Sequence, residues 1–231
     1  MISVTNLNKT YGGTAALKGL DFKISKGEFV LIFGPNGAGK STVLKTLSTL
    51  LAPTDGKILI YNTDIYDKSN DIRKNIGFVS HEPFLYENLS AQENLVFFAE
   101  LYGVNNPEIR ANDLLKTLQL ESRADELVTN YSRGMKQRVA LGRALIHEPD
   151  ILFLDEPFSG LDLIGSSIIT DILNKLKLKG KTIIMSTHSF DDCADLADRI
   201  LVLNNGEIAL ETNEVDREGF KNRYLELVTA D

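Results

Sequence analysis

One segment of the chain has the spacing of a phosphate-binding loop. The pattern is Gly, any four residues, then Gly-Lys-Ser/Thr. The matching residues, with the threonine that follows them, are Gly34, Pro35, Asn36, Gly37, Ala38, Gly39, Lys40, Ser41 and Thr42. Glycines let successive backbone N–H groups converge on phosphate oxygens, and a helix that starts here adds the positive end of its dipole. In such a loop the lysine reaches the β- and γ-phosphates and the serine hydroxyl can bind Mg²⁺. The sequence therefore predicts that the chain binds a nucleoside triphosphate together with Mg²⁺.

A pair of acidic residues, Asp155 and Glu156, follows the apolar run 151–154. One carboxylate of such a pair can hold Mg²⁺ directly or through water, and the next can polarise an attacking water. Two adjacent acids also occur in ordinary solvated turns, so the pair gains its weight from the phosphate-binding loop upstream. We expect Asp155 to be a metal ligand and Glu156 to be a general base.

The elements that would position these residues are buried strands and a helix. The run 29–33 is continuously apolar, as expected of a parallel strand covered on both faces, and it ends at the glycine-rich loop. The runs 151–154 and 182–185 have the same character, and each is followed by polar residues that belong at the carboxyl edge of a sheet. After the loop, five residues have the spacing of a helix with one buried stripe, namely Val43, Leu44, Leu47, Leu50 and Leu51. Pro53 and a turn at Asp55-Gly56 would end this helix.

The flanking segments predict a different kind of sheet. Apolar and polar residues tend to alternate between residues 2 and 24, which is typical of strands with one face in water. An Asn-Gly pair at 205–206 favours a type I′ hairpin between strands at 199–203 and 207–210.

The middle of the chain, residues 82–147, has no convincing strand. Helical stretches occur there, for example at 92–102 and 111–120. We therefore expect an all-helical insert.

Composition limits the function classes. The 231 residues suit one large domain or two small ones, and 43% hydrophobic with 25% charged residues is near the globular average. The longest apolar run is far shorter than the roughly 18 to 20 residues that a membrane-spanning helix needs, so a membrane role requires a partner. A net charge of -7 without a dense Lys/Arg tract argues against general binding to nucleic acid. A single cysteine, Cys193, and a start without signal-peptide features lead us to expect a reducing, cytoplasmic location.

Together these motifs resemble the ATP-binding subunit of ABC transporters, over essentially the whole chain. The most specific element is Tyr131-Ser132-Arg133-Gly134-Met135, which is similar to the Ser-Gly signature that opens a helix in this family. A serine cap with free backbone N–H groups makes an anion site, which agrees with this resemblance. Ser132 and Gly134 are the residues that would meet phosphate.

Three further residues take their roles from the resemblance. Tyr11 matches the aromatic residue that stacks on adenine, and His188 matches the switch histidine that senses the γ-phosphate. Asp162 belongs to a Ser-Gly-Leu-Asp loop, 159–162, that bridges two subunits in the family. Each is weak alone, and the order in which they occur supports the resemblance.

The resemblance implies a fold and an activity. The fold is α/β, a P-loop NTPase (RecA-like) core with an antiparallel β subdomain and an α-helical insert. A single ABC ATPase domain would span 1–231, with core 1–81 and 148–231 and the insert at about 82–147. Two chains, a homodimer or a pair with a related ATPase subunit, would close around two ATP and hydrolyse them. An integral-membrane transporter subunit would be the partner, at the cytoplasmic face of the membrane, and its short helix would meet an apolar surface made by Phe84, Leu85, Tyr86 and Leu89.

The chain departs from the family pattern at three positions. His81 stands where most members have a glutamine, and because imidazole is a poorer neutral partner for Mg²⁺ we do not assign it as a ligand. Arg133 and Met135 replace the commonest glycine and glutamine of the signature, which resembles export-type ATPases, including the ATPase of cytochrome c maturation haem exporters. His147 has no matching role and is predicted to be structural.

Two other function classes remain. A soluble ABC-type ATPase of an assembly system, such as iron–sulfur cluster assembly, has a similar length. A nucleotide-dependent binding module without catalysis would lack Glu156 or His188, and both are present. The transported substrate and the direction of transport lie outside what these residues encode.

Overall fold

The antiparallel part of the molecule is a four-stranded sheet with the order β2-β1-β4-β5. The structure, a computed structural model, describes residues 1–67, 69–189, 194–213, 219–220 and 222–224. The strands of this sheet are β1 (Ile2–Tyr11), β2 (Thr14–Ile24), β4 (Asp55–Ile60) and β5 (Thr63–Asp64). Buried and exposed residues alternate in the second half of β2, which confirms the period-two prediction.

The second sheet has six strands in the order β10-β9-β3-β8-β7-β6. They are β3 (Phe29–Phe33), β6 (Ile76–Val79), β7 (Ile151–Asp155), β8 (Thr182–Thr187), β9 (Arg199–Asn204) and β10 (Glu207–Thr212). Neighbouring strands from β9 to β6 are parallel, and every residue of β3, β7 and β8 is buried, as the continuous apolar runs predicted. Only β10 is antiparallel, and positive φ angles at Asn205 (48°) and Gly206 (84°) agree with the predicted hairpin. The polar residues that follow β3, β7 and β8 consequently meet at one edge.

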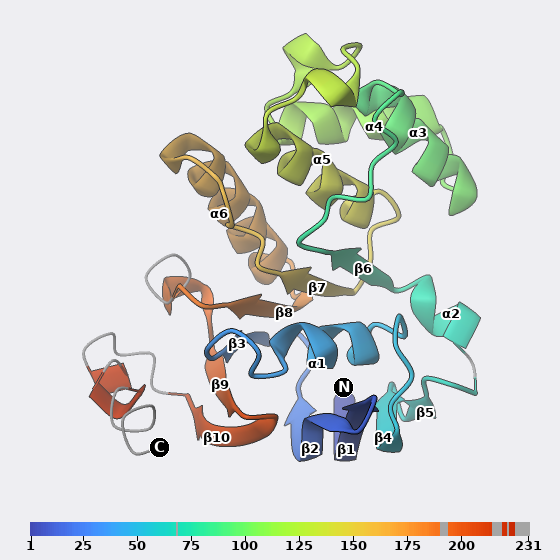
Figure 1. Ribbon diagram of the computed structural model, residues 1–231. Helices are drawn as coiled ribbons and strands as arrows, with labels where there is room; N and C mark the ends of the chain where they lie inside the picture. Colours follow the sequence, from blue (N-terminus) through green and yellow to red (C-terminus); the bar gives the residue numbers. More distant parts are fainter. Residues whose placement is uncertain (68, 190–193, 214–218, 221, 225–231) are drawn as a thin grey trace.

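Helices fill the space around this sheet. They are α1 (Lys40–Leu47), α2 (Ser69–Arg73), α3 (Ala91–Leu101), α4 (Pro107–Thr117), α5 (Arg133–Leu145) and α6 (Leu163–Leu178), with short 3₁₀ turns η1 (Glu121–Arg123), η2 (Val128–Asn130) and η3 (Ala194–Leu196). In Figure 1, α1 lies between the two sheets, and α3, α4 and α5 group together at the far end of the molecule. No helix in the described part of the chain is long and apolar enough to span a membrane.

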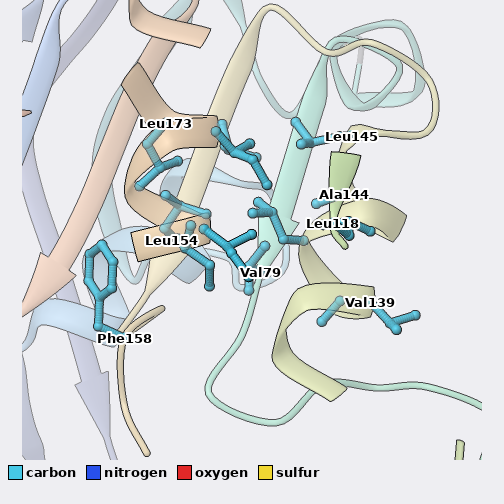
Figure 2. Packing of buried hydrophobic residues seen from close by; sticks show 14 of the residues in the cluster. Val79, Leu118, Val139, Ala144, Leu145, Leu154, Phe158 and Leu173 are labelled. Carbon is cyan, nitrogen blue, oxygen red and sulfur yellow. The ribbon is translucent and has the colours of Figure 1, made fainter. Parts of the chain in front are cut away.

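Two apolar cores hold the layers together. One joins α1 to the antiparallel sheet and to one face of the parallel strands. The other joins the opposite face of the parallel sheet to α5, α6 and the helical insert. Figure 2 shows part of this second core, where Val79, Leu154 and Leu173 point toward one another. Apolar side chains thus cover both faces of the parallel sheet, and its carboxyl edge carries the polar residues.

Several sequence-based boundaries were wrong. The first helix ends at Leu47, and Leu50 is 61% exposed because the chain turns away at Thr49, whose φ is 65°. Asp55-Gly56, predicted as a turn, opens β4 instead, and a Cβ on Gly56 would lie 2.2 Å from the carbonyl oxygen of Asn6. The helix expected at 111–120 runs from Pro107 to Thr117, because proline opens it one turn earlier.

The region 82–147, all of it described, contains helices and turns and a single isolated bridge outside the named strands. This agrees with the helical insert, although its division from the core at 82 and 147 stays a prediction. Cys193, predicted to be a small buried hydrophobe, lies outside the described residues.

Candidate functional site

The glycine-rich loop lies between β3 and α1, and two of its glycines are fixed by close backbone contacts. Gly34 has φ 152°, and a Cβ there would lie 2.2 Å from the carbonyl oxygen of Leu203. Gly39 has φ 104°, and a Cβ there would lie 2.8 Å from the carbonyl oxygen of Ala16. A side chain at either position would force the loop away from the strands that hold it. The loop geometry therefore depends on contacts that are distant in the sequence.

Lys40 begins α1, and its ammonium group is enclosed by the loop. Its Nζ donates to the carbonyl oxygens of Gly34 (2.8 Å) and Pro35 (3.1 Å) and lies 3.8 Å from Glu156 Oε1. The side chain is only 6% exposed. Burial lowers the pKa of Lys40, and the attraction of Glu156 and then of Asp155 opposes that shift. The site thus holds a buried cation next to two carboxylates.

Asp155, the last residue of β7, receives two hydroxyl donors. Ser41 Oγ donates to Asp155 Oδ1 over 2.9 Å, and Ser186 Oγ donates to the same oxygen over 2.7 Å. A hydroxyl and a carboxylate are the hard oxygen donors that Mg²⁺ prefers. No group of three or more His, Cys, Asp or Glu side chains among the described residues could hold a metal ion alone. The donor set therefore fits an ion that takes its remaining ligands from a nucleotide and water.

Glu156 directly follows β7 and is held by residues of the neighbouring strand β8 and the residue after it. Its φ is 53°, and its backbone N–H donates to the carbonyl and hydroxyl oxygens of Ser186, each over 3.2 Å. Its Oε2 lies 2.8 Å from Nδ1 of His188, which follows β8 and is 58% exposed. The left-handed backbone turns the carboxylate toward Lys40 and His188. The structure thus brings Glu156 and His188 into direct contact, which was not expected from the sequence.

These groups share one cavity of about 430 Å³. Its lining residues are Ala16, Asn36, Gly37, Gly39, Lys40, Ser41, Thr42, His81, Asp155, Glu156, Ser159 and His188. Tyr11 is not among them; it is exposed, and Lys9 Nζ lies 5.2 Å from the centre of its ring. The sequence did not predict that Ala16 and Ser159 line this cavity. Ala16 is an alanine within a strand, and Ser159 was noted only as part of the loop 159–162.

The signature residues form a second, separate cavity of about 260 Å³. Ser132 caps α5, its Oγ accepting from the Met135 N–H over 3.2 Å, and Asp162 caps α6, its Oδ1 accepting from the Gly165 N–H over 2.7 Å. The lining residues are Ser132, Arg133, Gly134, Met135, Arg138, Gly160, Asp162 and Gly165. None of them lines the cavity around Lys40. A single chain does not bring Ser132, Gly134 and Asp162 to the phosphate-binding loop.

A third cavity, of about 500 Å³, lies between the parallel sheet and the helical insert. Its lining residues are Lys45, Ser48, Thr49, Leu50, Arg73, Ile76, Phe78, Ser80, Phe84, Phe98, Tyr102, Arg143, Ala144 and His147. Of the four apolar residues predicted after His81, Phe84 and Tyr86 are exposed, while Leu85 packs against the core and Leu89 is half-buried.

Two residues shape the wall of this third cavity. Arg143 donates to the carbonyl oxygens of Phe84 (2.9 Å) and Phe78 (3.3 Å). His147 stacks on Tyr102 with ring centres 3.8 Å apart, and its Nε2 lies 3.0 Å from the carbonyl oxygen of Ile76. Burial lowers the pKa of His147. These contacts agree with the structural role predicted for His147.

Comparison with known proteins gives a consistent result. Residues 17–159 match the family described as "ABC transporter". The chain is 36% identical over 215 residues to the ABC transporter ATP-binding protein NatA of Bacillus subtilis, which covers 90% of this chain and 87% of that protein. It is 37% identical over 212 residues to the Nod factor export ATP-binding protein I of Rhizobium etli, covering 91% of this chain and 67% of that protein. Among solved structures, the ATP-binding cassette MJ0796, described as a dimeric post-hydrolysis state bound to ADP and Pi, has a TM-score of 0.85 at 34% identity and covers 92% of this chain and 98% of its own.

Proposed function

The chain belongs to the ABC transporter family, as an ATP-binding subunit that hydrolyses ATP to power transport, and we propose from this premise how its residues divide the work. The observation that carries the proposal is the convergence of Lys40, Asp155, Glu156 and His188 on one cavity at the carboxyl edge of β3, β7 and β8. Ligands of open α/β sheets bind at this edge.

In the proposed mechanism the triphosphate lies over the loop 34–41, with backbone N–H groups and Lys40 on its β- and γ-phosphates. Glu156 accepts a proton from water as the water oxygen bonds to the γ-phosphorus and the bond to the ADP oxygen breaks. His188, held 2.8 Å from Glu156, contacts the γ-phosphate and keeps the carboxylate oriented. Tyr11 remains our candidate for stacking on adenine, although it lies outside the cavity of the single chain.

Mg²⁺ fits the oxygen donors Ser41 and Asp155, which are already 2.9 Å apart. When bound, the ion would neutralise charge on the β- and γ-phosphates. The hydroxyl–carboxylate contact keeps both donors in place on the protein side.

We propose that the active unit is a pair of chains, in which Ser132, Gly134 and Asp162 of one chain complete the site of the other. The separation of the two cavities within one chain supports this arrangement, and the similar cassette MJ0796 is described as dimeric. Directly after Asp162, Leu163 and Ile164 are 91% and 70% exposed. Two adjacent exposed aliphatic side chains at the edge of the signature cavity favour a protein partner there.

The partner in transport is proposed to be an integral-membrane subunit at the cytoplasmic face, which docks on the third cavity. That cavity combines apolar side chains such as Phe84 and Phe98 with the cations Lys45, Arg73 and Arg143, and no carboxylate lines it. An amphipathic helix with an apolar face suits such a groove. The export function in the name of the Rhizobium etli relative favours export as the direction for this chain too, and it makes a soluble assembly ATPase the weaker alternative.

A mixing experiment tests the shared site. Lys40→Ala removes the loop cation of a chain, and Gly134→Asp places a carboxylate where the partner's phosphates would lie. Each variant alone should lack ATPase activity. In a mixed pair, however, the intact loop of the Gly134→Asp chain meets the intact signature of the Lys40→Ala chain. We therefore expect mixing to restore hydrolysis above either variant alone. Absence of recovery, with both variants folded, would contradict the two-chain site.

A further inference from the structure

Arg133 lies between the two residues proposed to meet the partner's phosphate, yet its side chain turns toward its own chain. It is the first residue of α5, and its Nη2 donates to Ser159 Oγ over 3.1 Å. A Cβ on Gly160 would lie 2.8 to 2.9 Å from the Cδ, Nε and Cζ atoms of Arg133. The side chain therefore lies flat against the backbone of Gly160, in space that only glycine leaves open.

The loop that Arg133 contacts is the one that holds Glu156. The Ser159 N–H donates to the carbonyl oxygen of Glu156 over 3.1 Å, so the two residues belong to one tight turn. Ser159 lines the cavity with Lys40 and Glu156, whereas Gly160 lines the cavity with Ser132 and Gly134. The adjacent residues Ser159 and Gly160 thus face different cavities, and Arg133 contacts both of these residues.

We propose that Arg133 is a positioning residue that couples the two ATP sites of the pair by linking the signature of each chain to the Glu156 of the same chain. The inference rests on the proposed two-chain site, because the signature of a chain contacts the partner's ATP while its Glu156 serves its own. Any displacement of the start of α5 by the partner's nucleotide reaches Ser159 through the guanidinium and Glu156 through the turn. A glycine at position 133 has no side chain with which to make this link.

The link is testable because folding does not depend on it. Arg133 is exposed and Ser159 is half-buried in the single chain, and an exposed hydrogen bond adds little to stability. Variants at both positions should therefore fold with an unchanged unfolding temperature. Coupling between sites is reciprocal in binding affinity and commonly amounts to a factor of about five or more.

The experiment is a double-mutant cycle on ATP hydrolysis with Arg133→Met, Ser159→Ala and the double variant. Arg133→Met keeps the aliphatic body and removes the donors. We expect each single variant to lower kcat by about fivefold or more, to bring the Hill coefficient for ATP from above one toward one, and to leave KM nearly unchanged. The double variant should be no slower than the slower single variant, since both changes break one link. Arg133→Lys, which keeps one donor group, should recover part of the cooperativity, and the exposed Lys116→Met serves as the control cation.

Other outcomes overturn the inference. Losses that multiply in the double variant, or a wild-type Hill coefficient of one, contradict the link. A raised KM in Arg133→Met with Ser159→Ala silent means that Arg133 binds the partner's nucleotide directly. Recovery in the mixing experiment together with unchanged cooperativity in Arg133→Met refutes this inference alone, whereas absence of recovery refutes the two-chain site as well.

Discussion

Glu156→Gln is the change that separates ATP binding from hydrolysis most cleanly. Glutamine keeps the size of the side chain and loses its charge and its ability to accept a proton. A positioned general base contributes about 10² to 10⁴ in rate, which corresponds to about 2.7 to 5.4 kcal/mol in the activation barrier. We therefore expect turnover to fall by that factor when the carboxylate is replaced.

ATP binding should respond in the opposite direction. Glu156 Oε1 lies 3.8 Å from Lys40 Nζ, where unit charges near a protein surface attract by about 4 kcal/mol. In the proposed site this carboxylate competes with the γ-phosphate for Lys40. Its removal lowers the pKa of the buried Lys40 further in the empty site, because Glu156 is the largest influence that raises it. Bound phosphates replace that negative charge, so the affinity for ATP should be retained or increased.

The assay compares steady-state ATP hydrolysis with equilibrium ATP binding. Glu148→Gln is a matched control, since Glu148 has almost the same backbone conformation (φ 56° against 53°) and lies outside the cavity. Multi-turnover hydrolysis by Glu156→Gln within about twofold of the wild type, measured with the membrane partner present, would refute the general-base role. Loss of ATP binding would refute the charge argument.

Three further predictions concern the loop, the signature and the third cavity. Gly34→Ala should lower the unfolding temperature and the affinity for ATP more than Gly37→Ala does. The reason is that a Cβ at Gly34 would lie 2.2 Å from the carbonyl oxygen of Leu203, while a Cβ at Gly37 would meet nothing within 4 Å. Calorimetry compares the two variants, and equal losses would contradict this reasoning. Ser132→Ala removes the cap of α5 and should cost about 1 kcal/mol in the free energy of unfolding. It should also weaken ATP-dependent pairing, which light scattering measures, and intact pairing would contradict the role of Ser132. Burial holds the pKa of His147 below its ordinary value of 6.5, so below that pH the unfolded chain takes up a proton that the folded chain resists. As the pH is lowered below 6.5, the free energy of unfolding should therefore decrease by at most about 1.4 kcal/mol per pH unit. Denaturant titrations of His147→Phe should lack this contribution. An unchanged pH slope in that variant would show that His147 is not its source.

The parts of the site that were predictable from sequence are those encoded locally. The loop 34–41 and the pair Asp155-Glu156 carry their own spacing, and each follows a continuous apolar run of the kind typical of a buried strand. His188 and Glu156 both follow parallel strands, whose carboxyl ends meet at one edge, but their direct contact was not predicted. The prediction that Leu50 belongs to the buried face of the helix was wrong, because helical spacing does not reveal the turn at Thr49 that follows the helix.

Contacts that depend on side-chain direction across the fold could not be predicted. The hydrogen bond from Arg133 to Ser159 joins residues 26 positions apart, and it depends on the absence of a side chain at Gly160. Of the apolar residues predicted after His81 as a docking surface, Phe84 and Tyr86 are exposed, but Leu85 packs against the core, and packing with distant segments fixes that orientation.

The charges of the two cavities explain why pairing should depend on nucleotide. The cavity around the loop has Lys40 against the carboxylates Asp155 and Glu156, so it is poor in positive charge for a ligand as anionic as ATP. The signature cavity has the opposite balance, with Arg133 and Arg138 against Asp162. In the proposed pair, apposed chains bring Arg138 and the helix dipole at Ser132 of one chain toward the triphosphate of the other, while Arg133 stays on its own loop. In this proposal, release of phosphate after hydrolysis removes much of the negative charge that the signature side faces, which favours separation of the pair.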